Sequence, residues 1–201
     1  MTKATLVALF LIALNSPVSA APVITNGSFE SLGFAAPTGF IILPVGSTAV
    51  SGWSIGGAAG VDYFKVATVV SDGLYSIDLV RGPGQGGVIS TTATGLSAGA
   101  LYELTFDIDQ ILINPGTTIT VMAGAASGSF LNATPGVYHT YSLDFVATGP
   151  TAPISFAGPA TGAIDAGVFV DNVRIAAVPE PATLVLLGFG LAGLGFSRRK
   201  Q

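Results

Sequence analysis

Short stretches of alternating apolar and polar residues run through the middle of the 201-residue chain. In segment 102–109, Tyr, Leu, Phe and Ile alternate with Glu, Thr and Asp. A strand with one buried face requires this period of two, and segments 141–145 and 169–175 repeat it. Each segment is therefore a predicted strand. The carboxylates of Asp107 and Asp109 share one face of theirs, which we expect to be solvated.

Seven further segments are short, apolar and often β-branched, and Gly, Pro, Ser or Thr separates them. They are 23–25, 41–45, 61–66, 75–80, 87–92, 117–123 and 154–157. No window between them has a convincing helical period. Ten short strands with turns at this spacing predict an all-β fold. The expected architecture is an antiparallel sandwich, with jelly-roll topology favoured over an immunoglobulin-like one.

The N-terminus has the pattern of a secretory signal peptide. Lys3 precedes the apolar run 4–14, and small residues follow at Val18, Ser19 and Ala20. A charged start, an apolar centre and a small-residue end are what signal peptidase recognises. We expect a signal helix over 1–20 that is cleaved after Ala20, with Ala21 as the alternative.

A second apolar segment, 182–196, contains no charged residue and lies near the C-terminus. Pro179, Glu180 and Pro181 precede it, and proline can neither continue a strand nor sit inside a helix. As a helix this segment would be roughly 23 Å long, which is shorter than the roughly 30 Å hydrocarbon core of a bilayer. The sequence therefore indicates a sorting signal, with a permanent tail anchor as the alternative. The chain continues after it with three basic residues, Arg198, Arg199 and Lys200.

Residues 178–201 resemble the PEP-CTERM sorting signal of Gram-negative bacteria. The Pro-Glu-Pro tripeptide, a Gly- and Leu-rich hydrophobic helix and a basic end occur in that order. The resemblance implies recognition by a membrane-embedded exosortase, with 182–196 inserted transiently in the inner membrane. It also implies cleavage near Pro179 and delivery to the cell surface or extracellular matrix. With both signals removed, one domain is expected over 21–177.

The charge of this middle part limits its partners. Residues 21–178 contain three basic and ten acidic side chains, a net charge of −7. Nucleic acids and anionic lipids require a basic surface that neutralises phosphates, so neither is an expected partner. The chain has no cysteine, which excludes disulfides and thiolate metal sites.

Several short motifs occur through the middle part of the chain. They are Thr25-Asn26-Gly27-Ser28-Phe29-Glu30, Ser51-Gly52-Trp53, Val61-Asp62-Tyr63, Asp72-Gly73, Ser76-Ile77-Asp78-Leu79, Tyr102-Glu103-Leu104-Thr105-Phe106-Asp107 and Val170-Asp171-Asn172-Val173. In this order they are similar to the DUF642 family and to related choice-of-anchor domains, and the inserts 34–44 and 111–115 depart from the family pattern. The resemblance implies a galactose-binding-like jelly roll, a fold shared with many carbohydrate-binding modules.

The resemblance also implies a structural calcium ion held by Glu30 and Asp171, with backbone carbonyls completing an oxygen shell. Asp171 is expected on the same face as Phe169 and Val173, and a buried carboxylate needs a cation or hydrogen-bond donors. In the alternative, Asp171 accepts backbone N–H groups and Glu30 is solvated.

Sugar binding on this fold usually relies on exposed aromatic rings. The ligand-binding candidates are Tyr63, Tyr75 and Tyr138, although buried tyrosines that hydrogen-bond through their hydroxyls are an equally common alternative. Trp53 follows a Ser-Gly turn and is expected in the core or at a strand edge.

No catalytic constellation emerges from the chain. The Gly82–Gly87 segment contains the spacing G-x-G-x-x-G, but a strand follows it where a dinucleotide site requires a helix. The single histidine, His139, has no nucleophile motif beside it, and we expect it on a strand surface. We predict a non-catalytic exported protein that binds glycan or exopolysaccharide. The alternatives are a structural matrix or adhesion protein acting through protein contacts and, third, an exported hydrolase.

Overall fold

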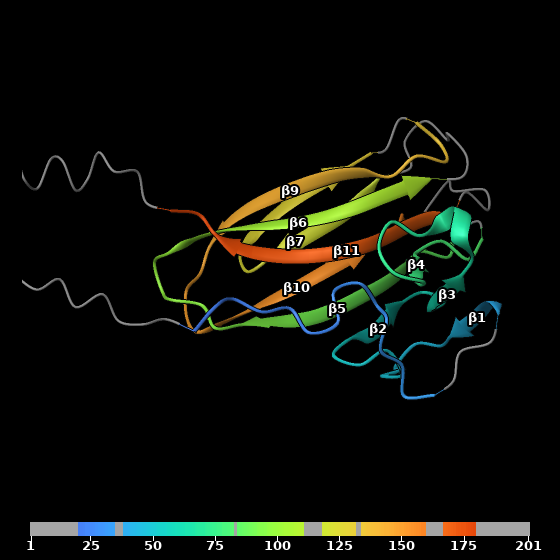
Figure 1. Cartoon of the computed structure of the whole chain (residues 1–201), viewed down its shortest axis with the longest axis horizontal. Coiled ribbons are helices and arrows are strands. Elements are labelled where there is room, and N and C mark those ends of the chain that lie inside the picture. Colours follow the sequence, from blue (N-terminus) through green and yellow to red (C-terminus); the bar gives the residue numbers. More distant parts are fainter. Residues whose placement is uncertain are drawn as a thin grey trace, which may run out of the picture.

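The protein's computed structural model describes residues 20–34, 38–82, 84–110, 118–131, 134–159 and 167–179. Two antiparallel sheets pack face to face around one hydrophobic core (Figure 1). The six-stranded sheet has the order β1 (Gly39–Leu43), β3 (Val61–Lys65), β4 (Ser76–Asp78), β11 (Val168–Ala177), β6 (Leu101–Gln110) and β9 (His139–Val146). The five-stranded sheet has the order β2 (Ser54–Gly57), β5 (Gly87–Thr94), β10 (Thr151–Ala157), β7 (Ile119–Ala123) and β8 (Ala126–Phe130). This confirms the predicted all-β antiparallel sandwich.

Nine of the ten predicted segments contain a strand, and segment 23–25 does not. Only an isolated bridge between Val23 and Thr94 forms there. Strands β2 and β8 were not predicted, because their sequences SIGG and ASGSF contain no β-branched or aromatic alternation. Pairing with β5 and β7 holds them in the sheet, which shows how strongly β-structure depends on its neighbours.

The chain described by the structure contains a single helical turn, η1 (Ala67–Val69), and no helix there is long and apolar enough to cross a membrane. The expected signal helix and C-terminal hydrophobic helix fall in 1–19 and 180–201, outside the described residues. The Gly82 segment is a turn, as predicted, in which the Gln85 N–H donates to the Gly82 carbonyl oxygen at 3.0 Å. Strand β5 begins directly after it.

Aromatic side chains from both sheets meet in the core. Phe106 of β6 and Phe156 of β10 lie edge to face, with ring centroids 5.1 Å apart. Trp53 is in the core as predicted, with 2% of its surface exposed. Its ring lies 5.0 Å from that of Phe29 and 6.3 Å from that of Phe156, so it joins the N-terminal turn to the five-stranded sheet.

Both ends of the described domain leave from the same pole (Figure 1). Val23 exchanges two backbone hydrogen bonds with Thr94, and the Val178 N–H donates to the Leu101 carbonyl oxygen at 2.9 Å. Thr94 and Leu101 flank the connection between β5 and β6. Segments that precede and follow the domain are therefore attached at one end of the sandwich.

The outer face of the six-stranded sheet is covered at Asp107 and Asp109, which corrects the expectation that these carboxylates are solvated. Their exposed fractions are 6% and 1%. A loop over residues 66–75, which includes η1, lies on this face, and we call it the covering loop. The Ser71 hydroxyl donates to Asp107 Oδ2 at 2.8 Å, and the Tyr138 hydroxyl donates to the Val69 carbonyl oxygen at 2.7 Å. Alternation in the sequence identified a polar face but could not show that a distant loop covers it.

Candidate functional site

The first calcium candidate, Glu30, fixes the covering loop. Its Oε1 accepts the backbone N–H groups of Leu74 at 2.8 Å and Tyr75 at 2.9 Å. Gly73 has a φ of +71°, and a Cβ there would overlap the Glu30 carboxylate. The glycine is thus required for the close approach of this carboxylate to the loop.

The second candidate, Asp171, holds the same loop from the sheet side and is fully buried. Its Oδ2 accepts the N–H groups of Ser71 at 2.8 Å and Asp72 at 3.0 Å, and its Oδ1 accepts the Asn172 N–H. Burial raises the pKa of Asp171 to about 6, and these hydrogen bonds lower it only in part. Asp171 faces outward beneath the loop, in register with Asp107.

Both carboxylates therefore bind backbone donors of one loop, Asp171 at residues 71 and 72 and Glu30 at 74 and 75. Ca²⁺ requires six to eight oxygen ligands. Within the described ranges, no group of three or more His, Cys, Asp or Glu side chains lies close enough together to hold a metal ion. A calcium ion held by Glu30, Asp171 and backbone carbonyls stays a prediction, and the hydrogen bonds of Asp171 are those of the alternative given for it.

Thermal unfolding with and without a chelator tests calcium directly. Because backbone donors already satisfy Glu30 and Asp171, we expect the same melting temperature in excess EDTA and in millimolar Ca²⁺. A melting temperature that falls by several degrees in EDTA and recovers with Ca²⁺ would support the calcium site instead.

Asp171 also predicts a pH dependence of stability. Its pKa is about 6 in the folded protein against 3.8 for an unperturbed aspartate side chain, so the folded state binds the proton more tightly. Its stabilising contribution is complete below pH 3.8 and is lost as the pH rises through 6. The loss amounts to at most roughly 3 kcal/mol. Urea unfolding between pH 4 and 7 should show this component in the wild type and not in Asp171→Asn. Equal pH slopes for the two proteins would contradict it.

The sequence motifs that carry the family resemblance meet in space around this loop. Asn26 Nδ2 donates to the carbonyl oxygens of Ser31 and Ser51, both at 3.0 Å. Trp53 Nε1 donates to the Asn26 carbonyl oxygen at 3.0 Å, and the Asp72 carboxylate accepts the Ser28 hydroxyl at 2.7 Å. These motif residues tie the N-terminal turn, the turn before β2 and the covering loop together, which is a structural task.

Two of the three candidate tyrosines have their hydroxyls turned into the protein. Tyr63 is only 2% exposed and donates to the Phe29 carbonyl oxygen at 2.7 Å, so its prediction as an exposed platform is wrong. Tyr138 donates to the covering loop, and burial raises the pKa of both hydroxyls. Tyr75 is half-buried and stacks on Tyr63 at 4.9 Å, with Lys65 Nζ 5.3 Å from its ring centroid. A ligand role for Tyr75 stays a prediction.

The other predicted residues are placed as follows. His139 is exposed at the start of β9, as expected. Ala20 and Pro179 are exposed at the pole where the chain ends leave. The remaining sorting residues, Glu180, Pro181, Arg198, Arg199 and Lys200, lie outside the described residues.

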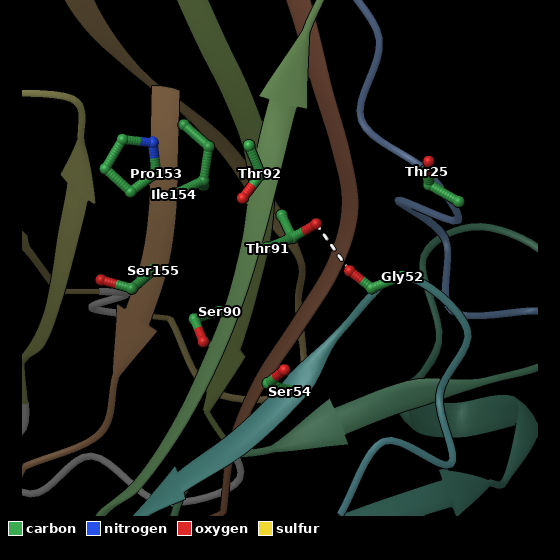
Figure 2. Close-up of a pocket in the computed structure, with 9 residues that line it drawn as sticks. All are labelled: Thr25, Gly52, Ser54, Ser90, Thr91, Thr92, Pro153, Ile154 and Ser155. Atoms are coloured by element: carbon green, nitrogen blue, oxygen red, sulfur yellow. Dashed lines mark hydrogen bonds between the residues drawn. The ribbon is translucent and has the colours of Figure 1, made fainter. Parts of the chain in front are cut away.

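A hollow that the sequence did not predict lies on the five-stranded sheet and encloses about 430 Å³. Figure 2 shows its lining from β2, β5, β10 and the N-terminal segment. We call it the serine hollow. It is lined by Thr25, Gly52, Ser54, Ser90, Thr91, Thr92, Pro153, Ile154 and Ser155.

Most hydroxyls of the serine hollow are available to a ligand. Thr91 donates its hydroxyl to the Gly52 carbonyl oxygen at 2.7 Å (Figure 2). The side chains of Ser54, Ser90 and Ser155 accept and donate no hydrogen bond within the part of the chain that the structure describes. Each hydroxyl can donate one hydrogen bond and accept two. The hollow thus offers uncommitted donors and acceptors close together.

The five-stranded sheet carries no charged residue in any of its strands. The basic groups of the domain lie elsewhere, with partners. Arg81 Nε contacts Asp62 Oδ1 at 2.9 Å, and Arg174 contacts Asp72 Oδ2 at 3.3 Å. The sequence did contain a signal for an uncharged sheet, because the polar positions of segment 87–94 are Ser and Thr throughout. What the sequence could not show is that β2, β5 and β10 lie side by side.

A protein-family model described as the PEP-CTERM protein-sorting motif matches residues 177–200. The chain thus carries this sorting motif at its C-terminal end, which implies export and delivery to the cell surface. Halomucin from Haloquadratum walsbyi is 31% identical over 170 residues. The match covers 79% of this chain, but the chain spans only 2% of the length of halomucin.

Solved structures share the sandwich. The arabinose-bound α-L-arabinofuranosidase MgGH51 matches with a TM-score of 0.54 and 15% identity, over 79% of this chain and 27% of that one. The module TmCBM61 in complex with β-1,4-galactotriose matches with a TM-score of 0.47 and 17% identity, over 64% of this chain and 90% of that one. At 15% identity the likeness to MgGH51 shows a shared two-sheet fold and nothing beyond it.

Proposed function

We propose that this protein is a non-catalytic glycan-binding protein, delivered to the cell surface or extracellular matrix, that binds its ligand in the serine hollow. The sorting motif at residues 177–200 supports the destination. The observation that carries the binding function is the uncharged, hydroxyl-lined hollow on the five-stranded sheet. The ligand is a polysaccharide of the surrounding matrix, and the processing partners are signal peptidase and an exosortase.

Hydroxyl groups suit a glycan because both sides can donate and accept. A sugar presents several hydroxyls around its ring, and Ser54, Ser90 and Ser155 present the matching groups from three adjacent strands. Pro153 adds an exposed apolar ring at the edge of the hollow, where the C–H face of a sugar could pack. Anchoring polar groups beside some apolar surface is the usual composition of a small-molecule site.

Catalysis has no support in this hollow. Its lining contains no carboxylate, histidine or lysine, and hydrolysis of a glycosidic bond requires a general acid and a second carboxylate. The exposed His139 is on β9, in the other sheet. Binding without turnover is therefore the function proposed.

A matched pair of double variants tests the location. Ser90 and Ser155 are register partners on the five-stranded sheet, and Thr105 and Ser142 are register partners on the outer face of the six-stranded sheet. Ser90→Leu/Ser155→Leu removes two hydroxyls and fills the hollow. Losing two hydrogen bonds should weaken binding by about tenfold or more.

The measurement is affinity electrophoresis of residues 21–178 in gels that contain a panel of polysaccharides. We expect retardation of the wild type and of Thr105→Leu/Ser142→Leu in at least one gel, and free migration of Ser90→Leu/Ser155→Leu. If no polysaccharide retards the wild type, the proposed function is wrong. If both double variants are retarded like the wild type, the ligand binds elsewhere.

A second candidate function is a structural matrix protein that associates with copies of itself. The observation that favours it is β1, a sheet-edge strand without a charged residue. Phe40 is 56% and Ile42 51% exposed on its outer side, and the Phe40 ring stacks on Phe64 at 5.2 Å. An uncharged apolar edge strand is a template for pairing with another chain.

Sedimentation velocity over a range of concentrations distinguishes this candidate. If β1 edges pair, the wild type should form dimers at high concentration and Ile42→Lys should remain monomeric. A wild type that is monomeric throughout would remove the second candidate and leave glycan binding unaffected.

A further inference from the structure

Side chains in register form a row across the whole outer face of the five-stranded sheet. Antiparallel partners that lie directly opposite each other point to the same side of a sheet. The register joins one residue from each strand, and two of the four pairings in the row join one serine to another. In strand order the row is Ser54, Ser90, Ser155, Met122 and Ser127.

The row begins in the serine hollow and continues past it. Ser54, Ser90 and Ser155 line the hollow, whereas Met122 and Ser127 lie beyond it on β7 and β8. Met122 is 47% exposed and Ser127 is exposed as well. Adjacent strands are about 4.8 Å apart, so five strands place side chains along roughly 19 Å of surface.

The neighbouring row of side chains does not obstruct access to this row. Its members are small or short side chains, Gly56, Val88, Ala157, Thr120 and Ser129. No aromatic or long charged side chain rises between the two rows. Small side chains beside the row therefore let the serine hollow continue as an open surface that suits an extended chain.

Charge on the molecule points to the kind of chain. The five strands contribute no cation to this face. The domain's basic side chains lie outside these strands, with Arg81 and Arg174 held by carboxylates and Lys65 over the Tyr75 ring. A polyanion would meet no counter-charge here and would be repelled by the net negative domain.

We propose that the ligand of this face is an uncharged polysaccharide whose extended chain lies across all five strands, with about one sugar unit for each strand. This inference rests on the proposed function and adds the ligand's charge class, length and direction. Hydroxyls of the sugar units pair with the serine hydroxyls, and the Met122 side chain supplies apolar contact between them.

A panel of neutral and anionic polymers tests the charge class. The neutral probes are hydroxyethyl cellulose, galactan, xylan and mannan, and the anionic probes are carboxymethyl cellulose, polygalacturonate and alginate. We expect the wild-type domain to be retarded by one or more neutral polymers and by none of the anionic ones. Retardation only by anionic polymers, or equally by both classes, overturns this inference and leaves glycan binding standing. Retardation by none overturns both.

Oligosaccharides cut from the bound neutral polymer test the length. Affinity measured by calorimetry should rise with each added unit up to about five, the number of strands in the row. Ser127→Leu should weaken binding of the five-unit ligand by about threefold or more and leave the two-unit ligand unchanged. The control Ser142→Leu should affect neither. If Ser127→Leu binds the five-unit ligand like the wild type, the ligand does not extend to β8.

Discussion

Replacing Trp53 by alanine should lower the free energy of unfolding by about 3–5 kcal/mol, the usual cost of truncating a large buried aromatic side chain. Trp53 is 2% exposed and contacts the rings of Phe29 and Phe156. Its Nε1 also donates to the Asn26 carbonyl oxygen. Alanine would leave a cavity between the N-terminal turn and the five-stranded sheet, and Gly52, in the wall of the serine hollow, is the preceding residue.

Trp53→Phe separates packing from hydrogen bonding. Phenylalanine keeps an aromatic ring in the core but loses the hydrogen bond to Asn26, which contributes about 1 kcal/mol, and the part of the packing that the larger indole supplies. Urea unfolding of the three proteins followed by circular dichroism provides the measurement. If Trp53→Ala costs no more than Trp53→Phe, the ring does not hold the turn to the sheet as described.

Replacing Gly87 by alanine should be at least as damaging. A Cβ at Gly87 would overlap the Gly60 carbonyl oxygen and lie 2.6 Å from Val61 Cγ1. Gly87 begins β5 and Val61 begins β3, so the clash falls where the two sheets approach each other. Backbone on one side of the contact cannot move out of the way without shifting a strand. We expect a loss of about 3 kcal/mol or more, as for overpacking at its most severe.

Gly149→Ala is the matched control. Gly149 has no atom within 4 Å of an added Cβ, and its φ is not positive. Alanine there should be neutral or stabilise the protein by about 0.4–1 kcal/mol, because it restricts the unfolded chain. Thermal unfolding of both variants provides the comparison. A Gly87→Ala protein as stable as Gly149→Ala would show that the sheets do not approach closely at this point.

The strands could be predicted where burial on one side imposes alternation. In β6, Tyr102, Leu104 and Phe106 point into the core, as the pattern indicated. Strands β2 and β8 lack that pattern, because their places in the sheet are set by partners distant in sequence. The same is true of Asp107, whose solvent exposure depends on a loop that lies more than thirty residues earlier in the chain.

The site could be predicted less completely than the fold. Motif similarity drew attention to Glu30 and Asp171, and both do meet one loop, but as acceptors of backbone N–H groups. Aromatic residues drew attention to Tyr63, which is in the core. The serine hollow was missed because serine and threonine are common in loops and strands alike. Only the register that places Ser54, Ser90 and Ser155 side by side distinguishes them.

If the proposed function holds, sorting and ligand binding use different parts of the molecule. Chain ends leave from the pole near Leu101 and Val178, whereas the hollow lies on the face of a sheet. A chain held by its C-terminal end at a surface would leave that face open. Under the proposed function the uncharged sheet binds the ligand, and the sheet with the charged face holds the covering loop.

The most direct test of this division is an NMR titration of ¹⁵N-labelled residues 21–178 with a neutral polysaccharide fragment that retards the domain in gels. The predicted result is that the amide signals of Ser54, Ser90 and Ser155 shift with ligand concentration, while those of Thr105 and Ser142 on the opposite sheet do not. Shifts confined to the six-stranded sheet or to the covering loop would contradict the assignment of binding to the uncharged face.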